Sequence, residues 1–342
     1  MNDAATASDS SLPLLARFPL LGAVPRVPLG RFPTPVVRVE AVAPGLWVKR
    51  EDLAGEPLGG NKLRALEFLL GGLRPGDRVT TVGAAGSTHV LATALYARRL
   101  GARSIVYRWP QEMNDAAHRV AARIATTADR APLVSGIPIA YARAFAARLS
   151  GARWIAAGGS APVGVLGQVN AGLELASQVI AGVLPPPDRI VVPLGTGGTV
   201  AGLALGLAIA GLEREIIGVR VVPRVVANRF RVRRLMGRTA RLLERLTSER
   251  LPRPKPGSVV VRHDFFGGAY GRAIIAGDAA TKRFYDETGI FIDATYGAKA
   301  LAAAIALAEQ LGGTTLFWLS FDGRWLHGDG NARSPTDIVA LA

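Results

Sequence analysis

The stretch VKREDLAGEPLGGNKLRALEFLL, residues 48–70, contains the residue on which the interpretation of this chain depends. Lys62 follows Gly59, Gly60 and Asn61 in a chain whose 41 basic residues include only five lysines. Arginine can supply surface charge but cannot form a Schiff base, so a lysine kept in such a chain indicates a role for its amine. The two glycines would let the backbone approach a flat cofactor closely. The alternative is a surface lysine at the start of a helix.

The composition is that of an ordinary globular protein with room for two domains. The chain has 342 residues, of which 49% are hydrophobic, and this is enough for a large core. The lack of cysteine excludes disulfides, thiolate metal sites and cysteine nucleophiles. The four histidines, His89, His118, His263 and His327, are scattered without the close spacing of a zinc site. We therefore predict no metal.

Neither of two candidate segments is expected to enter a membrane. The N-terminal stretch MNDAATASDSSLP has two acidic residues and no basic ones, unlike a signal peptide, so a cytoplasmic location is expected. The segment from Ile190 to Leu212 carries no charge and is long enough to cross a bilayer, but it contains Pro193 and a glycine cluster. A buried strand, a tight glycine turn and a buried helix explain this segment better.

The net charge of +15 and the sequence pI near 11.1 raise the possibility of nucleic-acid binding. Much of the excess lies in residues 224–253, where arginines decorate a predicted helix. We expect that helix to bury a stripe of leucines and to solvate its arginines. Its leucines are Leu235, Leu242, Leu243 and Leu246. Because zinc-finger spacing and aromatic stacking motifs are missing, a solvated basic face is favoured over a nucleic-acid surface.

Strand-like and helical segments alternate along the chain, as in an α/β protein. Strands are expected at residues 79–83, 104–107 and 190–194, and helices at 88–100 and 165–181. Leucine and valine runs without clean alternation indicate strands that are buried on both faces. The pattern predicts parallel sheets.

Two turns between a strand and a helix are candidate binding sites. In the turn GTGGT, backbone N–H groups at a helix start could bind a phosphate without a charged side chain, although a purely structural turn is the alternative. This turn comprises Gly195, Thr196, Gly197, Gly198 and Thr199. In the turn GSTH, Ser87 would cap a helix, which is worth about 1 kcal/mol. The same turn could hold a substrate carboxylate and leave the Ser87 hydroxyl free for proton transfer.

In combination, these motifs resemble the pyridoxal-phosphate enzymes of fold type II, most closely the group of aminocyclopropane-carboxylate deaminase and D-cysteine desulfhydrase. The resemblance runs from about Phe32 to Phe317. It is carried by LGGNKLRALEFLL at Leu58, GSTH at Gly86, GGSAPVGVLG at Gly158, PLGTGGTVAGL at Pro193, AYG at Ala269 and DATYGAKAL at Asp293.

The resemblance implies a two-domain α/β fold with three-layer parallel sheets, like that of the tryptophan synthase β subunit. Residues 1–63 and 176–342 are expected to form the large cofactor-binding domain, and residues 64–175 the small α/β domain. Residues 1–12 are expected to be a disordered tail. A homodimer is also implied.

The resemblance assigns roles to the motif residues by matching position. Lys62 corresponds to the lysine that forms the Schiff base with pyridoxal 5′-phosphate and moves the Cα proton, and residues 195–199 correspond to the phosphate loop. Ser87 corresponds to the family serine beside this lysine. Thr88 and His89 are implied to lie near the substrate carboxylate.

Tyr270 and Tyr296 match two family tyrosines that flank the substrate, although aromatic packing near a helix start is the alternative. Ser320 could replace the threonine that meets the pyridine nitrogen. Three departures from the pattern affect the reaction-specifying part of the site. Thr88 stands where the family usually has asparagine, Gly297 follows Tyr296 where the deaminases have glutamate, and the C-terminal LFWLSFDGRW lacks a histidine and paired glycines. The missing glutamate disfavours a cyclopropane deaminase.

The expected activity is therefore that of a pyridoxal-phosphate-dependent lyase or deaminase. It would act on a small amino acid by α,β-elimination to a 2-oxo acid and ammonia, as D-cysteine desulfhydrase does. Two alternatives remain. One is a relative with β-replacement, racemisation or a biosynthetic step, and the other is a non-catalytic relative whose basic face binds anionic partners.

Overall fold

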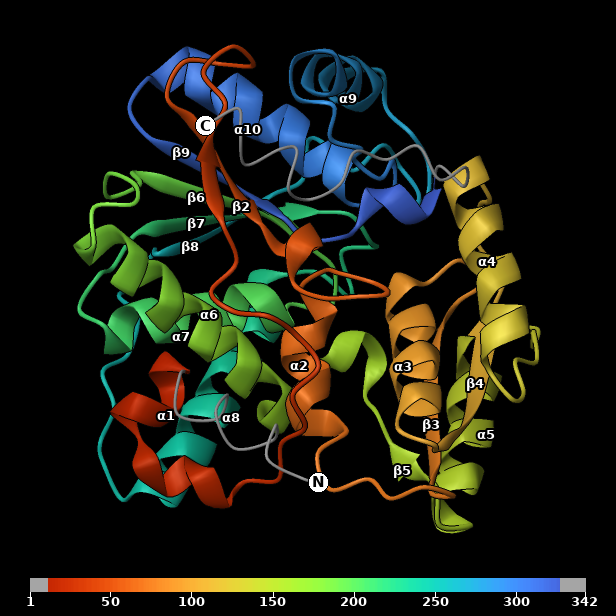
Figure 1. Cartoon of the computed structure of the whole chain (residues 1–342). Helices are drawn as coiled ribbons and strands as arrows, with labels where there is room; N and C mark the ends of the chain where they lie inside the picture. The colour runs from red at the N-terminus through yellow and green to blue at the C-terminus, as the bar shows by residue number, and fades with distance from the viewer. Residues whose placement is uncertain (1–11, 327–342) are drawn as a thin grey trace, which may run out of the picture.

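The computed structural model describes residues 12–326, except the side chain of Trp325, and contains two β-sheets flanked by helices (Figure 1). The strands are β1 (Val36–Arg38), β2 (Leu46–Arg50), β3 (Arg78–Ala84), β4 (Arg103–Trp109), β5 (Arg153–Trp154), β6 (Arg189–Leu194), β7 (Glu215–Arg220), β8 (Val259–Arg262) and β9 (Thr315–Leu319). Six of them form the large sheet, in the order β1-β2-β9-β6-β7-β8, and three form the small sheet, in the order β4-β3-β5. β1 runs antiparallel to β2, and the other neighbours are parallel.

Helices cover both faces of each sheet. They are α1 (Pro13–Arg17), α2 (Lys62–Leu69), α3 (Thr88–Arg99), α4 (Asp115–Thr127), α5 (Ile137–Leu149), α6 (Pro162–Ile180), α7 (Gly198–Ile209), α8 (Arg229–Thr247), α9 (Ile275–Thr288) and α10 (Gly297–Leu311). Short 3₁₀ helices are η2 (Pro19–Ala23), η3 (Glu51–Leu53), η4 (Ala157–Gly159) and η5 (Gly323–Leu326). α9 and α10 pack on one face of the large sheet, and α6, α7 and α8 pack on the other (Figure 1). In the small sheet, α5 lies on the face opposite α3 and α4. The architecture is the predicted α/β fold with parallel sheets.

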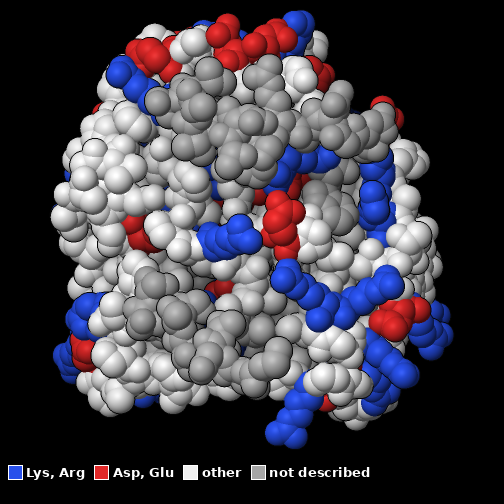
Figure 2. All heavy atoms as spheres, viewed as in Figure 1, with Lys and Arg blue, Asp and Glu red and all other residues white. Residues whose placement is uncertain are grey.

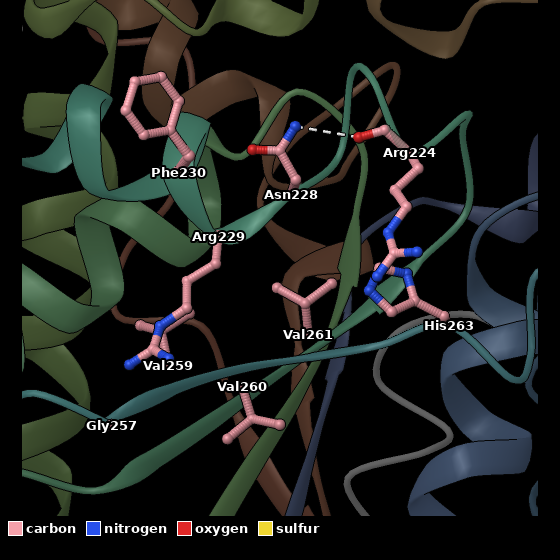
Figure 3. Close-up of a pocket in the computed structure, with 9 residues that line it drawn as sticks. All are labelled: Arg224, Asn228, Arg229, Phe230, Gly257, Val259, Val260, Val261 and His263. Carbon is pink, nitrogen blue, oxygen red and sulfur yellow. Dashed lines mark hydrogen bonds between the residues drawn. The ribbon is translucent and has the colours of Figure 1, made fainter.

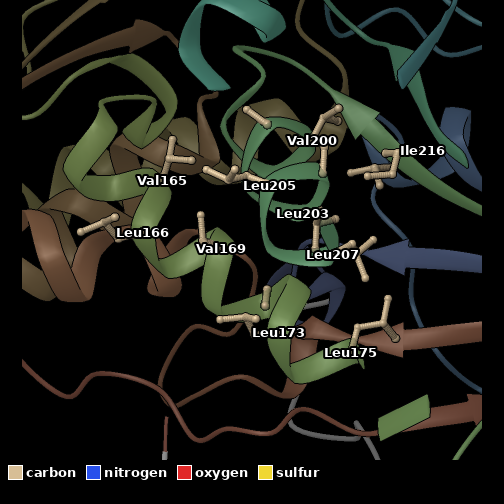
Figure 4. Close-up of a cluster of buried hydrophobic side chains, with 14 of the residues drawn as sticks. Val165, Leu166, Val169, Leu173, Leu175, Val200, Leu203, Leu205, Leu207 and Ile216 are labelled. Carbon is tan, nitrogen blue, oxygen red and sulfur yellow. The ribbon is translucent and has the colours of Figure 1, made fainter. Parts of the chain in front are cut away.

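The largest hydrophobic core joins α6 and α7 to the large sheet. Figure 4 shows Val165, Val169 and Leu173 of α6 beside Leu203 and Leu207 of α7. All five side chains are at most 7% exposed. The charge-free segment that follows Ile190 forms β6, a glycine turn and α7, which confirms its interpretation as a buried strand, turn and helix.

The predicted strands at 79–83, 104–107 and 190–194 and helices at 88–100 and 165–181 are confirmed as β3, β4, β6, α3 and α6. The leucine stripe of α8 is narrower than predicted. Leu235 and Leu243 are buried and Leu242 is partly buried, but Leu246 in the last turn is 36% exposed, although the next residue, Thr247, is buried. The arginines of α8 are exposed, as predicted.

The predicted division into residues 1–63 plus 176–342 and residues 64–175 stays a prediction, and its two internal boundaries fall within α2 and α6. Most of the predicted disordered tail lies outside the described residues, but Leu12 is buried. Across residues 12–326, no helix combines the length and the apolar character needed to span a membrane. On the face shown in Figure 2, basic side chains gather over the small sheet and its helices, with acidic side chains beside them.

Candidate active site

A cavity of about 450 Å³ collects most of the predicted site residues from both sheets. Its wall contains the predicted residues Lys62, Ser87, His89, Gly195, Thr196, Gly197, Gly198, Thr199, Tyr270, Tyr296 and Ser320. Apart from Tyr270, which lies in the loop between β8 and α9, these residues stand near strand ends and helix starts, because the carboxyl ends of parallel strands meet at one edge of a sheet. Thr88 is the exception: it does not line the cavity, and its side chain forms a hydrogen bond with Tyr296.

Lys62 is the first residue of α2, and the chain before it is fixed by backbone contacts. The Asn61 N–H donates to the Ser320 carbonyl at 3.0 Å, and the Gly60 N–H donates to the Glu51 carbonyl at 2.8 Å. A Cβ atom on Gly59 would lie 1.8 Å from the Asp52 carbonyl oxygen, and Gly60 has a φ of +120°. Both glycines are therefore required by the protein's own backbone, and their role in letting the backbone approach a flat cofactor stays a prediction.

The surroundings of Lys62 change the pKa of its amine. Burial lowers the pKa of Lys62 to about 8, because the charged form loses hydration in the cavity wall. A lysine with such a pKa is neutral in roughly a tenth of the molecules at pH 7, far more often than an ordinary lysine. The neutral amine is the form that attacks an aldehyde or accepts a proton.

The turn between β6 and α7 presents the start of a 12-residue helix to the cavity. A Cβ atom on Gly195 would meet no other atom within 4 Å, so this position faces open space. Two side-chain contacts hold the turn. The Thr199 hydroxyl accepts a hydrogen bond from the Asn61 amide at 2.9 Å, and the Thr196 and Ser160 hydroxyls are 2.6 Å apart. Free N–H groups and the helix dipole make this turn suitable for an anion.

Ser87 and His89 occupy the start of α3. Ser87 is the N-cap residue, and its hydroxyl accepts a long 3.4 Å hydrogen bond from the Val90 N–H, so capping leaves the hydroxyl weakly engaged. The His89 Nε2 lies 3.1 Å from the Thr81 hydroxyl. Burial, reinforced by the charge of Lys62, lowers the pKa of His89 to about 3. His89 is therefore neutral and offers a substrate carboxylate no positive charge.

Tyr270 and Tyr296 form a hydroxyl pair in the cavity. Their hydroxyl groups are hydrogen-bonded, and their rings meet edge to face with centroids 5.7 Å apart. Burial raises the pKa of Tyr296 to about 12 and that of Tyr270 still further from its usual value. Both hydroxyls keep their protons at neutral pH and can donate them.

A separate hollow of about 550 Å³ lies between the start of α8 and β8 (Figure 3). Its basic lining includes Arg224, Arg229 and His263. The side-chain amide of Asn228 donates to the Arg224 carbonyl at 2.9 Å and closes one end of the loop. None of the predicted site residues lines this hollow, so the cavity around Lys62 is the candidate active site.

Comparison with known proteins identifies the family of this chain. The family model described as pyridoxal-phosphate dependent enzyme matches residues 27–320. The chain belongs to this family. It is therefore a pyridoxal-phosphate-dependent enzyme, and the non-catalytic alternative is not retained.

Individual relatives cover nearly the whole chain. Nocardicin C-9′ epimerase of Nocardia uniformis subsp. tsuyamanensis is 36% identical over 87% of this chain and 93% of its own length. D-Cysteine desulfhydrase of Salmonella paratyphi A is 30% identical over 82% and 88%, respectively. The crystal structure of an ACC deaminase homologue is 26% identical and covers 96% of this chain and 99% of its own, with a TM-score of 0.76. The family and the fold type predicted from the sequence are thus confirmed.

The cofactor of this pyridoxal-phosphate enzyme is pyridoxal 5′-phosphate, and the residues of the cavity fit it. An anion-binding turn with open space at Gly195 lies in the same cavity as a lysine of lowered pKa. We propose that Lys62 bonds the cofactor aldehyde, that residues 195–199 hold its phosphate and that Ser320 meets its pyridine nitrogen. A neutral hydroxyl at the last position suits a ring nitrogen that is not protonated.

Several residues of the pyridoxal-phosphate site were not predicted. Asn61 and Ser160 form hydrogen bonds with the phosphate turn. Both lie within the motifs GGNK and GGSAP, which pointed to the family but did not indicate what these two residues do. Trp109, Tyr141 and Arg231 also line the cavity. No motif marks these three, because only the fold brings them to the site.

Proposed function

We propose that this enzyme catalyses α,β-elimination on an amino acid and releases a 2-oxo acid and ammonia. The observation that supports this proposal is that one cavity contains Lys62, the phosphate turn and the Tyr270–Tyr296 hydroxyl pair. A base, an anion-binding turn and a proton donor are the parts that such a reaction needs. The relationship to D-cysteine desulfhydrase suggests D-cysteine as the first substrate to test.

The proposed mechanism uses the neutral form of Lys62, which its lowered pKa makes accessible, and the protonated form of Tyr296. When bound, pyridoxal phosphate accepts the electron pair released at the substrate Cα. The neutral Lys62 Nζ takes the Cα proton, and the Tyr296 hydroxyl, kept protonated by burial, donates a proton to the departing β-substituent. With water, D-cysteine then gives pyruvate, ammonia and hydrogen sulfide.

Because His89 is neutral, it can offer the substrate carboxylate one N–H donor but no positive charge, so we infer that other groups of the α3 start contribute to binding. Backbone N–H groups there and the Ser87 hydroxyl are the donors that this turn offers. A positive charge on His89 beside that of Lys62 would be unfavourable. His89 therefore stays neutral and does not compete with Lys62 for protons.

The test is an assay of purified enzyme loaded with pyridoxal phosphate, with D-cysteine as the sole substrate. Pyruvate, ammonia and sulfide should appear in equal amounts while the visible absorption band of the bound cofactor shifts. If the band shifts but no pyruvate forms with D-cysteine or with other β-substituted alanines, elimination is wrong.

Epimerisation is the second candidate, and the similarity to nocardicin C-9′ epimerase favours it. Removal of the Cα proton by Lys62 and its return from another group in the same cavity would invert the centre without breaking a bond at Cβ. In D₂O, this reaction incorporates deuterium at Cα and brings the two Cα configurations towards equilibrium without forming pyruvate. One experiment therefore separates the two candidates.

The cytoplasmic location and the homodimer expected from the sequence remain proposals. Light scattering of the purified enzyme after size-exclusion chromatography measures the oligomeric state directly. A mass near twice 35.9 kDa would support the homodimer, and a mass near 35.9 kDa would contradict it.

A further inference from the structure

The active-site cavity extends beyond the residues that we assign to the cofactor and the proton transfers. The outer part of its wall comes from two directions. Trp109 at the end of β4, together with Ile137 and Tyr141 on α5, belongs to the small sheet and its helices. Val222 and Val226, between β7 and α8, belong to the large sheet. A substrate as small as cysteine would not need this apolar outer part.

Aromatic packing fixes the small-sheet side of this outer part. The rings of Trp109 and Tyr141 are stacked, with centroids 6.4 Å apart and an angle of 20° between their planes. Trp154 also packs against Tyr141, with ring centroids 6.0 Å apart and an angle of 56° between the ring planes. Ile137 lies one helical turn before Tyr141, so the two side chains share a face of α5.

These side chains present apolar surface to the cavity and to solvent. Ile137 is 48% exposed and Tyr141 is 42% exposed. Apolar surface left in water is unfavourable, and a ligand that covers it gains binding free energy of roughly 25 cal/mol for each Å² buried. Fixed aromatic rings bind a flat or apolar group at little cost in conformational entropy.

A cation lies beside this aromatic surface. Arg231, in the first turn of α8, lines the same cavity as Tyr141; burial raises the pKa of Tyr141, and the positive charge of Arg231 opposes that rise. Within residues 12–326, no carboxylate is ion-paired with Arg231, whereas the acidic Glu112 in the same wall is paired with Arg272 at 2.5 Å. The guanidinium group is therefore available to an anionic group of a ligand.

We propose that the natural substrate is a bulky amino acid whose aromatic or apolar side chain ends in an acidic group. Its amino-acid end lies at Lys62, its body covers Trp109, Ile137 and Tyr141, and its acid pairs with Arg231. This inference rests on the proposed function, because it assumes that chemistry occurs at the substrate Cα.

The experiment measures exchange of the Cα proton for deuterium in D₂O by the cofactor-loaded enzyme, since exchange reports proton removal by either candidate reaction. The probes are both enantiomers of 4-carboxyphenylalanine, phenylalanine and alanine. For one enantiomer, kcat/KM should rise at least tenfold from alanine to phenylalanine and again to the carboxylated probe. Equal or faster exchange of alanine would overturn the proposal.

Variants separate the two parts of the proposed substrate site. Arg231→Met should lower kcat/KM for 4-carboxyphenylalanine about tenfold and leave phenylalanine unchanged, with Arg234→Met on the exposed face of α8 as control. Tyr141→Ala should weaken both aromatic probes, with Phe145→Ala, one turn further along α5 and 57% exposed, as control. Equal effects of Arg231→Met on all probes would overturn the role of the acid.

Calorimetric binding of the same probes separates this proposal from the proposed function. If 4-carboxyphenylalanine binds more tightly than alanine but no probe exchanges its Cα proton, the substrate class stands and the Cα chemistry is wrong. If neither binding nor exchange favours the carboxylated probe, the substrate class is wrong whatever the reaction.

Discussion

The buried amine of Lys299 donates a hydrogen bond of 2.6 Å to the carbonyl oxygen of Phe266. A longer bond of 3.4 Å reaches the carbonyl of Ala269, the residue before Tyr270. Lys299 lies in the first turn of α10, just after Tyr296. This amine therefore connects the two segments that bring the Tyr270 and Tyr296 hydroxyls together.

Lys299→Met should misplace Tyr270 while leaving cofactor binding intact, because Lys299 does not line the cavity. We expect kcat to fall at least tenfold and the affinity for pyridoxal phosphate to change less than twofold. Lys282→Met, on an exposed face of α9, is the control. A folded Lys299→Met enzyme with normal kcat would show that the two carbonyl contacts do not position the tyrosine.

Lys62→Ala should abolish the covalent link to the cofactor without unfolding the protein. The lysine contributes its amine to the cavity, whereas α2 is held by its buried neighbours. The visible band of the bound cofactor should be lost, and reduction with borohydride should no longer attach the cofactor to the chain. Retention of a borohydride-reducible link in this variant would rule out Lys62 as the Schiff-base lysine.

The rate at which the apoprotein takes up pyridoxal phosphate should rise with pH through about 8. Lowering the pKa of a lysine increases the neutral, nucleophilic fraction at any given pH. From pH 7 to pH 9 this fraction grows about tenfold for a pKa of about 8, but about a hundredfold for an ordinary lysine. Stopped-flow absorbance measures the rate. A hundredfold rise would contradict the lowered pKa.

Ser87→Ala should slow turnover far more than it weakens cofactor binding. The hydroxyl caps α3 through a 3.4 Å bond, so little helix stability depends on it. We expect a loss of at least tenfold in kcat with a nearly unchanged dissociation constant for pyridoxal phosphate. An unchanged kcat would reduce Ser87 to a helix cap.

Glu174→Gln should destabilise the fold because it leaves buried cations uncompensated. Glu174 pairs with Lys49 at 2.5 Å and with Arg64 at 2.9 Å, and all three side chains are at most 2% exposed. Breaking a buried pair costs about 3–5 kcal/mol, whereas Glu309→Gln, at an exposed pair with Arg283, should cost at most about 1 kcal/mol. Urea unfolding at pH 7 measures both. Similar midpoints for the two variants would contradict the prediction.

The same carboxylate predicts how stability depends on acid. Burial alone would raise the pKa of Glu174, but the charges of Arg64 and Lys49 outweigh it and lower the pKa to about 2. Since the folded-state pKa is below that of the unfolded chain, this contribution is present above pH 4.5 and is lost as the pH falls towards about 2. Glu174→Gln should flatten the stability curve over that window.

The elements of the fold could be predicted because their signals are local. The apolar run before the GTGGT turn and the alanine-rich run after GSTH form β6 and α3 within one or two residues. Leu246 was predicted wrongly because a helical stripe does not reveal which of its positions the neighbouring elements cover.

The centre of the site could be predicted for a different reason. Lys62 and the phosphate turn each carry their chemistry in a short motif. The reason for Gly59 could not be predicted, since the Asp52 carbonyl that requires it is known only from the folded chain. Trp109 and Tyr141 are 32 positions apart in separate elements, and no periodicity links them to Arg231 on a third.

The position of α5 also bears on how this enzyme could change during evolution. Lys62, the phosphate turn and the tyrosine pair lie outside α5, whereas Ile137 and Tyr141 reach the cavity from one face of that helix. Substitutions at these two positions would alter the space offered to a side chain without touching the groups that move protons. One surface helix could thus diversify the choice of amino acid while the reaction is inherited unchanged.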